Sequence, residues 1–164
     1  MSAWAHFYPN CVPINHELKY AVPDRWLRFH YTPASQQGAS SADEVAAALH
    51  VMNTAATAVL GNGLACWVSG PLYSSNDMAY ADQLAVLRQL NMPKAGHLKL
   101  PNDEGHLDIY AALVSWIPNH FNDILRKIEN DEVHVMWMCA ATGAVFAPYD
   151  RGVDLILPTT TDVS

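Results

Sequence analysis

The sequence is poor in charged side chains and contains no long apolar run. Charged residues make up 15% of its 164 residues, against about 25% in an average domain. Lys and Arg number 9 and Asp and Glu 16, which gives a formal net charge of −7 at pH 7. A nucleic-acid partner needs a concentrated basic surface, so we expect none. A membrane-spanning helix needs roughly 20 apolar residues in a row, so we expect no membrane partner either.

Cysteines are also scarce, and they are widely spaced. Cys11, Cys66 and Cys139 do not form the dense, even set of a secreted disulfide framework, so we interpret them as reduced thiols. None lies in a CxxC pair or beside a histidine at ligand spacing, so no metal site is predicted. The N-terminus lacks the basic start and apolar run of a signal peptide, and we therefore expect a cytoplasmic protein.

The short motifs of nucleotide-binding proteins and hydrolases are missing as well. Gly61-Asn62-Gly63 follows a predicted helix, whereas a nucleotide-binding glycine motif follows a strand. Ser69-Gly70 has no upstream glycine that would complete a nucleophile elbow. We therefore predict no cofactor and no catalytic residue, which favours a protein that is not an enzyme.

What the sequence does contain is a large apolar fraction, 51%, arranged at the spacings of helices and strands. Residues 1–24 are predicted to form an irregular arm, because three prolines interrupt any helix there while several aromatic side chains favour burial. Residues 25–158 are predicted to form a single domain. The polar residues 159–164 are expected to be a frayed tail.

Three helices are predicted within this domain. The clearest begins after Ser40 or Ser41 and ends at Gly61, and with Ser41 as the cap, Glu44 completes a capping box. The other two span 78–90 and a segment that begins at Pro118.

Strand-like segments alternate with these helices. They are 25–31, 64–69, 107–116, 133–140, 145–147 and 153–157, while 91–105 is predicted to be loop with at most a short strand around Leu98. This pattern predicts an α+β fold with a mixed or antiparallel sheet of about five to six strands, and with three helices mainly on one face.

Charge gathers in one stretch, Pro148-Tyr149-Asp150-Arg151-Gly152-Val153-Asp154. A turn between two strands explains this stretch, because Asp150 can accept backbone N–H bonds and Gly152 supplies a positive φ. In the alternative, the carboxylates of Asp150 and Asp154 beside Arg151 do acid–base work or bind a cation. Of the eight histidines, His30 and His134 are functional candidates, each with a structural role as the alternative.

Two segments have the character of motifs. The first, Arg25 to His30, reads R-W-L-R-F-H, and the second runs from Pro148 to Pro158. They resemble the R-W-x-R-x-H and P-Y-D-G-G-x-D-h-h-L-P segments of small bacterial proteins that are classed only as a domain of unknown function. Arg151 stands where that pattern has its first glycine. The resemblance implies a single domain and carries no activity. With the charged stretch it gives the binding candidates Arg28, His30, Tyr149, Asp150, Arg151 and Asp154.

Two functional hypotheses follow. We expect a small, non-enzymatic cytosolic binding or interaction protein that acts as a homodimer, since a surface short of charge is often covered by another subunit. A protein partner, and an accessory or immunity-like role connected with mobile DNA, fit its size and acidity. The alternative is a small-molecule-binding protein or enzyme with a pocket lined by tryptophans and Tyr149, where His30 and Asp150 or Asp154 supply the polar groups.

Overall fold

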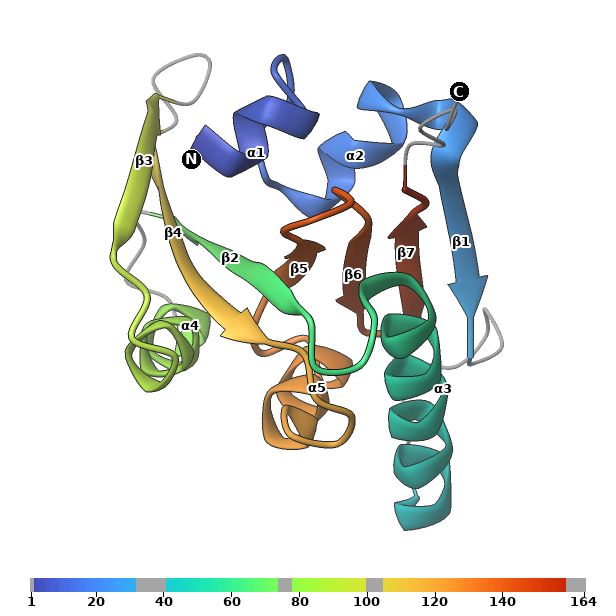
Figure 1. Cartoon of the computed structure of the whole chain (residues 1–164). Coiled ribbons are helices and arrows are strands. Elements are labelled where there is room, and N and C mark those ends of the chain that lie inside the picture. The colour runs from blue at the N-terminus through green and yellow to red at the C-terminus, as the bar shows by residue number, and fades with distance from the viewer. Residues whose placement is uncertain (1, 32–40, 74–77, 100–104, 159–164) are drawn as a thin grey trace, which may run out of the picture.

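The computed structural model describes residues 2–31, 41–73, 78–99 and 105–158. In these ranges the chain forms a seven-stranded antiparallel sheet between two layers of helices (Figure 1). The strands are β1 (Trp26–His30), β2 (Ala65–Tyr73), β3 (Lys94–Lys99), β4 (His106–Ser115), β5 (Met136–Cys139), β6 (Val145–Tyr149) and β7 (Gly152–Ile156). Their order is β1-β7-β6-β5-β2-β4-β3, so β1 and β3 form the two edges. The α+β class is therefore confirmed, with seven strands where five to six were predicted.

The additional strand lies where the sequence indicated mostly loop. β3 pairs with β4, and its register shifts between Lys94 and Gly96. Such a bulge absorbs one extra residue while the strand on either side stays paired. β2 likewise extends to Tyr73, beyond its predicted end at Ser69. β5 pairs with β2 only as far as Ser69, so at Pro71 the strand β2 pairs with β4 alone. Because no second strand needs its N–H there, a proline is tolerated.

Three helices, α3 (Ala42–Leu60), α4 (Met78–Gln89) and α5 (Asn122–Glu129), cover one face of the sheet (Figure 1). Ser41 caps α3: its hydroxyl accepts the Glu44 N–H at 3.2 Å, and its own N–H donates to Glu44 Oε2 at 2.9 Å. This is the predicted capping box, and Ser40, the other candidate, lies outside the described residues.

α5 begins at Asn122 and not at the predicted Pro118. Asn119 has a positive φ of 66°, which no α-helix accommodates, and its N–H donates to Asn53 Oδ1 of α3 at 2.7 Å. Trp116, Trp137 and Phe146 form a buried aromatic group in the core under α3, α4 and α5, with ring centroids 5.6–5.7 Å apart.

The opposite face is covered by the N-terminal segment, so the prediction of an irregular arm was wrong. Residues 1–24 contain α1 (Ser2–Phe7) and α2 (Asn15–Ala21). Three prolines were expected to prevent helices, but they lie outside α1 and α2 and flank them: Pro9, Pro13 and Pro23. Trp4, Tyr8 and Leu18 are buried against sheet residues such as Met136 and Ile156. The helices therefore cover both faces, whereas the sequence predicted one.

The turn between β5 and β6 holds α1 in place. The Tyr8 hydroxyl donates a hydrogen bond to the Gly143 carbonyl, and burial raises the pKa of Tyr8 to about 12. Gly143 has a φ of 70°, and a Cβ at this position would collide with the Phe7 ring. A glycine is therefore required where α1 meets the sheet.

The tail predicted over 159–164 lies outside the described residues. Among the helices that the structure does describe, none combines the length and the apolar character that crossing a membrane requires.

Trp4→Ala tests whether α1 is an integral layer. Because Trp4 is buried between α1 and the sheet, the variant should lose about 3 kcal/mol of unfolding free energy in urea titrations followed by circular dichroism. His6→Ala changes an exposed position of the same helix and should stay within about 0.5 kcal/mol of the unmodified chain. Equal stability of the two variants would show that α1 contributes little to folding.

Candidate functional site

Four of the six sequence-predicted candidates, Arg28, His30, Tyr149 and Asp154, lie on β1, β6 and β7. Arg28 lies opposite Asp154, and His30 lies opposite Gly152, which is also paired with Tyr149. Alternate residues of a strand share a face, so Arg28, His30 and Asp154 lie on the face that α1 and α2 cover. We call Trp26, Arg28, His30, Tyr149 and Asp154 the Arg28 cluster.

The centre of the Arg28 cluster is a two-pronged ion pair. Arg28 Nε donates to Asp154 Oδ1 at 2.7 Å and Arg28 Nη2 to Oδ2 at 2.8 Å, and only 1% of the Asp154 side chain is exposed. The guanidinium carbon also lies 5.1 Å from the Trp26 ring centre and 5.2 Å from that of Tyr149. The hydrogen bond to Asp154 raises the pKa of Arg28 further. The Asp154 carboxylate is thus occupied by Arg28.

His30 and Tyr149 complete the cluster without a hydrogen bond to this carboxylate. The His30 ring is exposed and meets the Tyr149 ring edge to face, with centroids 6.1 Å apart. Within the described ranges His30 forms no hydrogen bond with Asp150 or Asp154. The Tyr149 hydroxyl is buried and has no hydrogen-bond partner among the described residues, and burial raises the pKa of Tyr149. A Cβ at Gly152 would collide with the Phe29 carbonyl oxygen, so this position requires glycine.

Asp150 and Arg151 lie apart from this pair. They form the turn between β6 and β7, with Arg151 Nε 3.6 Å from Asp150 Oδ2. Both side chains are partly exposed, and in the described part of the chain neither is bonded to Arg28 or Asp154. The structure therefore does not bring the two carboxylates, Asp150 and Asp154, into one acid–base or cation site.

The other face of β1 carries an exposed apolar strip. Leu27 is 40% exposed and Phe29 50%, although their partners across the strand pair, Leu155 and Val153, are buried. α3 packs against β6 and β7. The apolar face of the sheet thus continues onto β1, beyond the cover of α3.

The outer edge of β1 also presents backbone hydrogen-bonding groups. The Tyr31 N–H donates to the Arg151 carbonyl at 3.1 Å, and the Arg25 carbonyl accepts the Leu157 N–H at 2.9 Å. Odd-numbered residues therefore bond inward to β7, and even-numbered residues turn their N–H and C=O groups outward. The outward residues are Trp26, Arg28 and His30.

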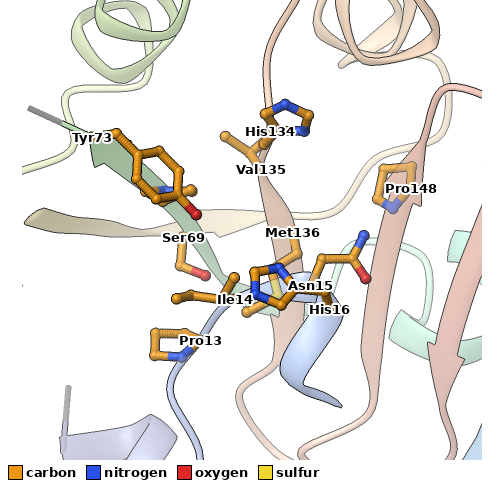
Figure 2. Close-up of a pocket in the computed structure, with 11 residues that line it drawn as sticks. Pro13, Ile14, Asn15, His16, Ser69, Tyr73, His134, Val135, Met136 and Pro148 are labelled. Atoms are coloured by element: carbon orange, nitrogen blue, oxygen red, sulfur yellow. The ribbon is translucent and has the colours of Figure 1, made fainter. Parts of the chain in front are cut away.

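A hollow of about 180 Å³ opens on the α1 and α2 face (Figure 2). In the sheet, β7 separates β1 from β6, the nearest strand that lines the hollow. We call it the Ser69 hollow. It lies between the start of α2 and the strands β2, β5 and β6, and its lining is Pro13, Ile14, Asn15, His16, Ser69, Pro71, Tyr73, His134, Val135, Met136 and Pro148. None of the six predicted binding candidates lines it.

The hollow forms because β2 and β5 diverge. Their pairing ends at Ser69 opposite Met136. Beyond that point Gln83 of α4 bridges them: its Nε2 donates to the carbonyls of Pro71 and His134 at 2.8 Å, and its Oε1 accepts the His134 N–H at 2.8 Å. This site was not predicted because Gly70-Pro71 was interpreted as the end of the strand. The signal that could have revealed it is the polar Gln83 on a helix face otherwise apolar.

The cysteines and histidines show no sign of a metal centre. Cys66 and Cys139 are buried opposite each other on β2 and β5, and burial raises the pKa of Cys66 to about 12. The reactive thiolate form is therefore scarce at neutral pH. Across the described ranges, no three His, Cys, Asp or Glu side chains are grouped so that they could hold a metal ion.

Arg28→Met tests the ion pair. The variant leaves the buried Asp154 carboxylate without its guanidinium, so it should lose about 3 kcal/mol of unfolding free energy in urea titrations. The double variant Arg28→Met/Asp154→Leu removes both charges and should recover part of this loss. Arg151→Met breaks a surface pair and should cost less than about 1 kcal/mol. Equal losses for Arg28→Met and Arg151→Met would contradict a structural role for the pair.

Comparison with known proteins places the chain in a family. The model of one family, described as a domain of unknown function (DUF3885), matches residues 14–164. The match includes every strand that the structure describes and all of its helices except α1. The chain therefore belongs to this family, which confirms the resemblance to a domain of unknown function. Neither the curated proteins nor the solved structures gave a significant match.

Proposed function

We propose that this member of a family without an assigned activity is a non-enzymatic binding protein that forms a homodimer through the outer edge of β1. The observation that carries the proposal is the exposure of Leu27 and Phe29 on an edge strand. An edge strand with apolar side chains is a template for pairing with a further strand. A second copy of the chain offers the same strand, and a two-fold axis makes such a contact self-complementary.

The backbone of β1 supports one register for this contact. Antiparallel pairing of two copies, centred on Arg28, uses all five residues of the strand. It places the outward groups of Arg28 opposite those of Arg28 in the second copy, and those of Trp26 opposite those of His30. Each such pair exchanges two N–H···O bonds. Leu27 then faces Phe29 of the second copy as a closely spaced pair, which joins the two apolar strips.

The charges of β1 are compatible with this register. The two facing Arg28 guanidiniums are each neutralised by a two-pronged bond to Asp154 of their own copy. Natural edge strands carry lysines, prolines or unpaired inward charges, which prevent pairing with another chain. Trp26–His30 has none of these. The edge thus lacks the usual features that prevent association.

The geometry favours this interpretation over a small-molecule site at the same residues. Such a site needs His30 and Asp150 or Asp154 to converge in a concave pocket, but Asp154 is bound by Arg28 and His30 is exposed. The accessory or immunity-like role and the cytoplasmic location stay predictions from composition.

Light scattering coupled to size exclusion tests the homodimer. At about 100 µM, where a micromolar complex is mostly associated, the chain should have twice its mass of 18.1 kDa. Phe29→Lys places a charge in the apolar strip and should give the mass of one chain. His30→Pro should do the same, because it removes an outward N–H without removing a bond to β7.

Leu113→Lys is the matched control. Leu113 is 56% exposed and lies on β4, which β7, β6, β5 and β2 separate from β1, so its replacement should leave the dimer mass unchanged. A single-chain mass for the unmodified protein at this concentration would overturn the proposal. So would a dimer that survives both β1 variants.

A further inference from the structure

The Ser69 hollow has the size of a site for one ring. Its volume of about 180 Å³ is close to that of an engineered apolar cavity, about 150 Å³, that holds benzene. The Asn15 amide holds α2 at one side of the hollow, since its Nδ2 donates to the Ala147 carbonyl at 3.5 Å. Gln83 fixes the opposite side, where β2 and β5 diverge. The hollow is therefore a feature of the framework and is not formed by an exposed loop alone.

The walls of the hollow are mostly apolar. They comprise Pro13, Ile14, Pro71, Val135, Met136 and Pro148. Met136 is buried at the base, and its thioether can contact the edge or face of an aromatic ring favourably. Walls of this kind suit an aromatic ring better than a sugar or a phosphate.

Two hydroxyl groups are directed into the hollow (Figure 2). Ser69 is only 7% exposed, and its hydroxyl forms no hydrogen bond with any residue that the structure describes. The Tyr73 hydroxyl is directed to the same space from the other end of β2. In the free protein, water in the hollow is left to bond these hydroxyls, and a polar group of a ligand can take the place of that water. The ligand should therefore carry a hydroxyl or carbonyl oxygen.

The rim of the hollow offers no surplus charge. His16 Nε2 lies 3.3 Å from Glu17 Oε1, and His134 Nε2 lies 3.7 Å from Asp131 Oδ1, so each imidazole has a carboxylate beside it. Among the lining residues that the structure describes, none is a lysine or an arginine. A charged phosphate or carboxylate would have no counter-ion here, which favours an uncharged ligand.

From these observations we infer that the Ser69 hollow binds an uncharged single-ring aromatic compound that carries a hydroxyl or carbonyl group. The hollow is lined by α2, β2, β5 and β6 and does not include β1. The inference is therefore independent of the proposed homodimer, and either can fail without the other.

Phenol is the probe for this inference, and methionine-methyl NMR of the full chain is the readout. Addition of phenol should shift the Met136 methyl resonance in a saturable way, with a dissociation constant on the order of 1 mM, because so small a ligand makes few contacts. Ser69→Ala should weaken binding about five-fold, the effect of one hydrogen bond. Benzoate, which is charged, and cyclohexanol, which is not aromatic, should both bind several-fold more weakly than phenol.

Two further variants keep the experiment decisive. Tyr73→Phe removes a hydroxyl from a side chain that is 41% exposed, so it should weaken phenol binding without disturbing the fold. Ser115→Ala removes an exposed hydroxyl from β4 and should bind phenol as the unmodified chain does. Unsaturable shifts spread over the 6 methionines would overturn the inference. Equal phenol affinity of Ser69→Ala, Tyr73→Phe and the unmodified chain would do the same.

Discussion

The position of β1 depends on the ion pair between Arg28 and Asp154. A carboxylate that is 1% exposed is unfavourable in a sheet unless a cation neutralises it, and the cation comes from the neighbouring strand. The Trp26 and Tyr149 rings also lie close to the guanidinium, with their centres 5.1 and 5.2 Å from its carbon. The pair therefore fixes the register of β1 on β7, and the register decides which residues of β1 face outward.

The two faces of β1 differ in how their side chains are used. On the α1 and α2 side, the Arg28 cluster uses its charges internally. On the opposite side α3 covers β6 and β7, while Leu27 and Phe29 remain exposed. The proposed contact with a second copy and the proposed ligand site thus belong to different parts of the molecule, one an edge and the other a gap between diverging strands.

Sequence analysis predicted most of what depends on neighbouring residues. The capping box of Ser41 and Glu44 and the strand that contains Arg28 are local patterns, and both are present. It selected Arg28 and Asp154 as candidates but not as partners, because 126 positions separate them and the carboxylate was considered with Asp150. The Ser69 hollow was not predicted, since it results from the end of a strand pairing and a glutamine from a helix on the other face. α1 and α2 were missed because their prolines lie between helices.

Because the first strand pairs with the last, the time that synthesis takes separates β1 from its partner. In the described structure β1 bonds to β7 alone, and β7 is the final strand to be synthesised. At about 5–20 residues per second, the 126 positions between Arg28 and Asp154 take roughly 6–25 s to synthesise. During this time β1, with its exposed Leu27 and Phe29, has no partner within its own chain.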